Sequence, residues 1–130
     1  MTTFSAARMA VRVVGLAMLI LGLVVWTGSA AGLVPVHMLL GIVLVLALWA
    51  VAVLALQAGV RPVLPAIAIA WGVLMAAFGM TQAQLLSDDS LHVVIQVAHL
   101  VVGLVAIGLA EALGAAATRT GSPASISRAN

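Results

Sequence analysis

Two histidines, His37 and His99, are the side chains of this sequence best placed to do chemistry, because both interrupt long apolar stretches. Each precedes a glycine, Gly41 or Gly103, within the shared pattern His-x-x-x-Gly-x-Val. Ionisable residues are costly inside a membrane and usually face the protein interior with a partner. Two neutral imidazoles that project inward from opposite helices can supply both axial ligands of a haem iron. The matched pair therefore predicts bis-His ligation.

Six glycines could make room for a flat macrocycle beside these histidines. Gly41 and Gly103 lie one helical turn from the two imidazoles, where a larger side chain would collide with the ring. The other four occur in the remaining apolar segments, at Gly15, Gly22, Gly72 and Gly79. Met18 and Met75 would add soft packing around such a ring. Alternatively, these glycines only allow helices to approach closely, as small residues do in many membrane proteins.

The third histidine, His92, fits less well as a metal ligand. On one helix His92 and His99 would be two turns apart, roughly 10 Å along the axis. Zinc and copper sites normally need three or four ligands in one compact shell, which these residues do not provide easily. We expect His92 at the membrane interface, in contact with water or a haem propionate. The chain has no cysteine, which excludes thiolate-ligated clusters.

The elements that must position these residues are transmembrane helices. Hydrophobic residues make up 65% of the 130 residues and charged residues only 6%, against about 25% charged in a typical soluble domain. One crossing takes about 20 helical residues, so the uncharged runs accommodate four. We expect an all-α integral membrane four-helix bundle with helices at about 9–26, 35–57, 62–83 and 91–113. These form one domain, 1–117, followed by a disordered cytoplasmic tail, 118–130.

The arginines predict the orientation of the bundle. They fall before the first span, between the second and third, and after the fourth, at Arg8, Arg12, Arg61, Arg119 and Arg128. The positive-inside rule then places both termini in the cytoplasm and the loop with Asp88 and Asp89 outside. A cleaved signal peptide at the start would leave three spans and break this pattern. We expect the cytoplasmic (inner) membrane of a prokaryote.

An internal repeat would bring the histidines together. Besides the two His-x-x-x-Gly strings, the first and third apolar segments share Gly-x-x-Met-x-x-x-Gly, beginning at Gly15 and Gly72. Two such hairpins, related by an axis along the membrane normal, would make His37 and His99 face each other. Small or polar residues form one stripe on the later histidine helix, at positions 92, 96, 99, 103, 106 and 110, and positions 37, 41, 44 and 48 form the corresponding stripe on the earlier one. We expect both stripes to face the bundle interior.

Across residues 9–113 the chain resembles one four-helix half of the haem A synthase family, and more broadly a four-helix membrane b-type cytochrome. The resemblance rests on the His positions of the second and fourth helices, and it implies a haem b held by His37 and His99. The chain departs from the family in its acids. Its segment 27–34 has none, and Glu111 is expected near the cytoplasmic end, far from the histidines. The resemblance therefore implies haem binding but not oxidation of a haem methyl group, so an enzymatic role stays open.

Two classes of function follow from these observations. The first is a membrane haem b protein for electron transfer or haem handling, with other membrane or redox proteins, or a second copy of itself, as partners. The second is a cofactor-free accessory subunit of a larger membrane complex, whose glycines are helix contacts. A transporter has less support, because no acid is expected at mid-membrane. The excess of basic over acidic residues reflects membrane topology and contact with anionic lipid, so we expect no nucleic-acid partner.

Overall fold

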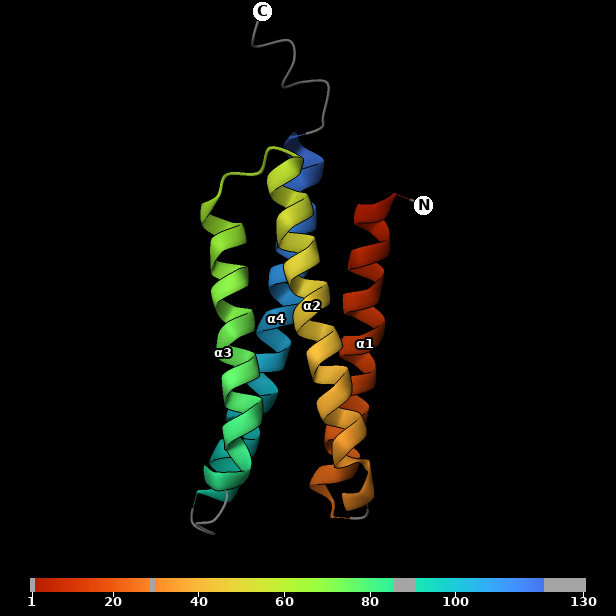
Figure 1. Ribbon diagram of the computed structural model, residues 1–130, viewed down its shortest axis with the longest axis vertical. Helices are drawn as coiled ribbons and strands as arrows, with labels where there is room; N and C mark the ends of the chain where they lie inside the picture. The colour runs from red at the N-terminus through yellow and green to blue at the C-terminus, as the bar shows by residue number, and fades with distance from the viewer. Residues whose placement is uncertain (1, 29, 86–90, 121–130) are drawn as a thin grey trace, which may run out of the picture.

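The protein is a bundle of four long helices (Figure 1). The computed structural model describes residues 2–28, 30–85 and 91–120. Its elements are α1 (Thr3–Trp26), the short 3-10 turn η1 (Ala31–Leu33), α2 (Val34–Gln57), α3 (Val63–Leu85) and α4 (His92–Thr120). All four α-helices are long and apolar enough to cross a membrane. The expected all-α four-helix class is therefore confirmed for the described residues.

The helices alternate in direction, and α2 and α4 form the central pair of the bundle. These two helices pack against each other, and each also packs against α1 and α3. The flanking helices α1 and α3 lie on opposite sides of that pair, and the start of α1 lies at the same end of the bundle as the end of α4 (Figure 1). Four helices that alternate in direction require this arrangement. Which end faces the cytoplasm remains a prediction from the arginines.

Two helices extend more than two residues beyond the bounds expected from hydropathy. α1 begins at Thr3 because Thr2 caps it, with the Thr2 side-chain oxygen accepting from the Ser5 amide at 3.2 Å. α4 continues past residue 113 to Thr120, since the alanine-rich sequence there is helix-forming and contains no proline. Residues 118–120 are thus helical, while the rest of the expected tail lies outside the described residues. So do Asp88 and Asp89 of the expected outer loop.

Gly59 shapes the turn that joins α2 to α3. Its φ is +82°, a conformation that favours glycine. Its amide donates to the Leu56 carbonyl at 3.0 Å, and the Val60 amide donates to the Ala55 carbonyl at 3.0 Å. This is the Schellman pattern that ends a helix. It reverses the chain sharply enough for α3 to return alongside α2.

The core is small, and much of the apolar surface faces outward. Leu44 and Leu48 of α2 and Ala106 and Ala110 of α4 are 0–2% exposed, which confirms the predicted inward stripes at these positions. The exposed side includes large apolar residues such as Met80, at 71% exposed. Contiguous apolar surface of this kind marks contact with lipid or with another protein. The outer faces therefore suit a bilayer.

Candidate functional site

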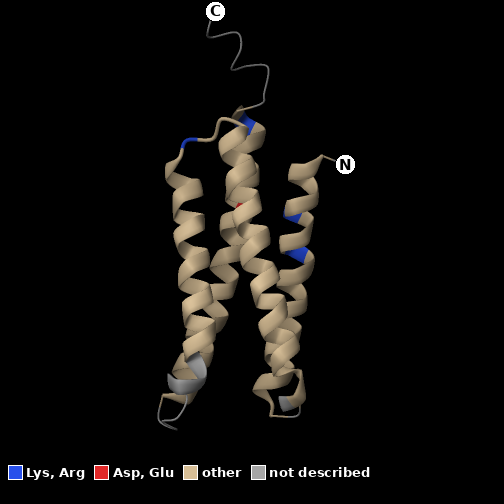
Figure 2. Cartoon of the chain, in the orientation of Figure 1, with Lys and Arg blue, Asp and Glu red and all other residues tan. Residues whose placement is uncertain are grey.

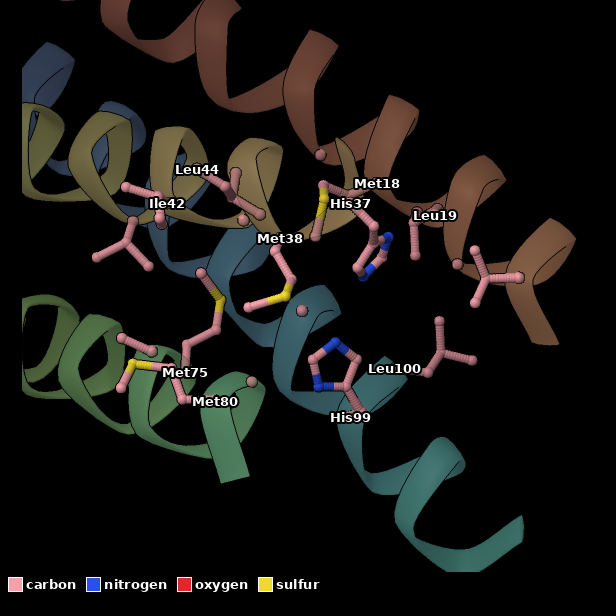
Figure 3. A pocket seen from close by; sticks show the side chains of 18 of the residues that line it. Met18, Leu19, His37, Met38, Ile42, Leu44, Met75, Met80, His99 and Leu100 are labelled. Atoms are coloured by element: carbon pink, nitrogen blue, oxygen red, sulfur yellow. The ribbon is translucent and has the colours of Figure 1, made fainter. Parts of the chain in front are cut away.

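The imidazoles of His37 and His99 face each other inside the bundle. His37 is in the first turns of α2 and His99 is two turns into α4. The two ring centroids are 6.0 Å apart and the ring planes are tilted by 45°. Figure 3 shows the rings projecting from different helices into one hollow. The crossing of the central helix pair thus brings together two residues from distant parts of the sequence.

A cavity of about 490 Å³ surrounds the two rings, a size typical of sites for small molecules and cofactors. Its walls are almost wholly apolar, and all four helices contribute to them. Five of the six glycines expected around a cofactor line it: Gly15, Gly22, Gly41, Gly79 and Gly103. The structure therefore gathers most of the predicted site residues around the histidines.

Four of these glycines leave the space beside the histidines clear. A Cβ added at Gly22 would lie 3.4 Å from Cε1 of His37, and one added at Gly79 would lie 3.9 Å from Cε1 of His99. At Gly41 the nearest atom is the Met18 methyl carbon at 3.5 Å, and at Gly103 no atom lies within 4 Å. Side chains at these positions would project toward the rings or into the cavity. The expected clearance is thus present at each of them.

Gly15 and Gly72 act differently from the other four. A Cβ at Gly15 would lie 2.7 Å from the terminal carbon of Ile107, so this glycine permits close packing of α1 on α4. Gly72 does not line the cavity, because the indole of Trp49 occupies the space of the missing side chain. Trp49 also donates its Nε1 hydrogen to the Ile69 carbonyl at 3.1 Å. At these two positions glycine serves helix packing, which is the alternative interpretation stated above.

The two imidazoles lack hydrogen-bond partners within the described part of the chain. Nδ1 of His37 and Nδ1 of His99 are both buried and unpaired. Leaving a buried polar group unsatisfied costs about 1–3 kcal/mol, and such groups in a folded protein call for an explanation. A ligand between the rings would provide one, because an imidazole nitrogen can bind a metal or accept a hydrogen bond.

Other polar groups near the cavity do not form a compact metal shell. His92 Nε2 and Gln96 Nε2 are 2.8 Å apart, so His92, two turns before His99 on the same helix, is engaged by Gln96. Within residues 2–28, 30–85 and 91–120, no three His, Asp or Glu side chains are grouped closely enough to hold a metal ion. Among the described residues, the two facing imidazoles are the groups of this cavity that could bind a metal.

Several residues of the site were not expected from the sequence. The ring of Phe78 on α3 is 5.8 Å from the ring of His99, centroid to centroid, and tilted by 41°. Met38, Met80 and Leu100 also line the cavity and surround the two rings in Figure 3. No sequence motif marks these residues. Their only signal is their helical spacing from a histidine or glycine of the site.

Glu111 is separate from this site. Its Oε2 accepts from Arg8 Nη2 at 2.6 Å, and its Oε1 accepts from Arg12 Nε at 2.6 Å. These pairs tie α1 to α4 near the end of the bundle that carries the termini (Figure 2). Both carboxylate oxygens are thus occupied by guanidinium groups, three helical turns along α4 from His99. Glu111 has a structural place and does not line the cavity.

Comparison of the chain with protein-family models, with curated proteins and with solved structures gave no match. The functional interpretation therefore rests on the geometry of the site. That geometry consists of two inward imidazoles, an apolar cavity with glycine walls, and no acid among its lining residues. Such an arrangement can bind a flat, largely apolar cofactor and hold it away from water.

Proposed function

We propose that this chain is a membrane protein that holds one haem b between α2 and α4, with His37 and His99 as its axial ligands. The observation that carries the proposal is the pair of facing imidazoles with buried, unpaired Nδ1 atoms in a glycine-walled cavity. The resemblance to one half of the haem A synthase family agrees with it. The proposed role is electron transfer or haem handling.

The separation of the two rings is large enough for one metal to be held between them. A bond from a first-row metal to an imidazole nitrogen is about 2 Å long, and that nitrogen lies about 1 Å from the centroid of its five-membered ring. Two imidazoles on opposite sides of one metal would therefore have centroids about 6 Å apart. The observed separation is 6.0 Å.

Haem would supply a one-electron redox centre, and the residues of the chain determine how it is used. His37 and His99 would both hold the haem, and a haem held by two histidines is suited to electron transfer more than to oxygen chemistry. The apolar walls would exclude water, and Met18, Met38 and Phe78 would pack softly around a ring. With no acid in the cavity, an oxidising enzyme is a weaker proposal than a carrier or a redox protein.

Orientation and location complete the proposal. The arginines of the described residues gather toward the end of the bundle where both termini lie (Figure 2). Under the positive-inside rule this end would face the cytoplasm of a prokaryote, with the bundle in its inner membrane. The histidines would then lie toward the outer leaflet. Redox partners in or at the outer side of the membrane would have the shorter path to the haem.

A cofactor-free accessory subunit is the second candidate. Gly15 and Gly72 favour it, because at both positions a neighbouring side chain occupies the space of the missing one. On this interpretation the cavity is a packing defect, or it is filled by a lipid chain or a side chain of a larger complex. The two candidates predict opposite optical properties, since the first is coloured and the second is not.

Absorption spectra of the protein purified in mild detergent from haem-replete cells test the proposal. Wild type should show a low-spin b-type spectrum in its oxidised and reduced states, and His37→Ala and His99→Ala should each lose it. His92→Ala is the matched control, because it removes the other histidine of α4, which does not line the cavity, and it should keep the spectrum. A folded, colourless wild type would refute haem binding and leave the accessory subunit.

A further inference from the structure

A second hollow lies at the end of the bundle that carries the termini. It has a volume of about 820 Å³ and lies between the α2–α3 turn, the start of α3 and the end of α4. Arg61 comes from the turn and Arg119 from the last turn of α4, and both line it. The Thr120 hydroxyl donates to the Ala58 carbonyl at 2.9 Å. This bond ties the end of α4 to the turn, so the two arginines are carried by joined segments.

The charges of this hollow are not compensated by the protein. Neither Arg61 nor Arg119 forms an ion pair with another described residue. Glu111, the one acid within the described ranges, is already bound by Arg8 and Arg12. The start of α3 adds a partial positive charge, because the first amides of a helix point out of its N-terminus. The hollow is therefore suited to an anion.

The wall beneath the arginines is apolar. Val63 and Ile67 lie one turn apart on the outer side of α3, at 69% and 48% exposed, and both line the hollow. Leu64 and Ala116 are partly buried behind them. An occupant that matches both parts needs an anionic group at one end and a hydrocarbon chain at the other. In a bilayer, a phospholipid presents these two parts in this order along the membrane normal.

We propose that this hollow binds an anionic phospholipid, whose phosphate lies between Arg61 and Arg119 and whose acyl chain runs along Val63 and Ile67. The site is independent of the histidine cavity, which is lined by other residues. Its occupant would connect the α2–α3 turn with the end of α4 and fix the depth of that end in the leaflet. A zwitterionic lipid has the same chains but brings no net charge to the two arginines.

Lipid retention measured by native mass spectrometry tests the proposal. The detergent-purified full chain is mixed with equal amounts of phosphatidylglycerol and phosphatidylcholine that carry identical acyl chains. Wild type should retain phosphatidylglycerol preferentially. Arg61→Gln and Arg119→Gln should each lower the ratio of retained anionic to zwitterionic lipid about five-fold, the equivalent of about 1 kcal/mol per arginine. The double variant should lose the preference.

Arg12→Gln is the matched control, because it removes one positive charge at the same end of the bundle but outside the hollow. It should keep the wild-type ratio. Equal retention of the two lipids by wild type, or an equal loss in Arg12→Gln, would overturn the proposal. Added inorganic phosphate should not displace the lipid, and displacement by phosphate alone would assign the hollow to a free anion. Helical circular dichroism of each variant verifies the fold, since both exposed arginines can be replaced without burying a polar group.

Discussion

Replacing Gly103 by leucine should block the histidine cavity while leaving the bundle intact. Gly103 lines the cavity, and a Cβ at this position would meet no atom within 4 Å. Side chains of a helix lean toward its N-terminus and cover the preceding turn. The leucine side chain would therefore extend toward His99, four residues earlier. It would fill the space proposed for the edge of the macrocycle.

The size of the effect follows from the empty space around Gly103. The protein itself should not lose stability, because leucine meets open space and replaces a residue that costs a helix about 0.8–1 kcal/mol. A cofactor forced against the new side chain should lose about 1–3 kcal/mol, as in overpacked cores. This corresponds to roughly 5- to 150-fold weaker binding. Titration of haem into the apo-protein, followed by absorbance, gives the dissociation constant directly.

Gly108→Leu is the matched control on the same helix. A Cβ at Gly108 also meets nothing within 4 Å, but this residue is exposed and does not line the cavity. It should bind haem like wild type. Haem affinity equal to wild type in Gly103→Leu would show that no macrocycle lies beside this turn. A thermal midpoint lowered by Gly103→Leu and not by Gly108→Leu would show that the space is needed for packing.

Three further predictions concern the frame of the bundle. Gly72→Ala should lower the thermal midpoint measured by circular dichroism, with an overpacking cost of about 1–3 kcal/mol, because the added methyl must displace the Trp49 indole; an unchanged midpoint would contradict this. Glu111→Gln should also lower the thermal midpoint, since both ion pairs between α1 and α4 are lost. Added salt should lower the thermal midpoint of wild type toward that of the variant. The chain has no cysteine, so single cysteines can report the orientation of the bundle. A membrane-impermeant thiol reagent added to cells should label Leu91→Cys and not Thr118→Cys. The reverse pattern would show that the orientation is inverted.

The sequence was sufficient to predict the elements and their inward faces. Long uncharged runs specify helices in a bilayer, because no other open structure satisfies the backbone there. The stripes through His37 and His99 predicted which residues turn inward, and burial of Leu48 and Ala110 confirms them. Helix ends were less well predicted, since Thr2 capping and the alanine-rich end of α4 lie outside the apolar runs. Hydropathy carries no information on such local bonds.

The roles of individual glycines could not be predicted, because they depend on which side chain lies opposite. Gly72 and Gly79 are the first and last residues of the Gly-x-x-Met-x-x-x-Gly string on α3. The first faces the Trp49 indole and the second faces the His99 ring. A residue one helix away thus decides whether a glycine gives packing or space. The pairing of Arg8 with Glu111, far apart in the sequence, is equally invisible without the fold.

The central pairing of α2 and α4 bears on how the protein is made. His37 belongs to the first hairpin and His99 to the last of the four helices. During synthesis the chain emerges from its N-terminus, so an imidazole from α2 is in the membrane long before its counterpart exists. One hairpin alone offers a single imidazole and an open wall. If the proposed ligation holds, the arrival of α4 completes the site, and bound haem would report that biogenesis has finished correctly.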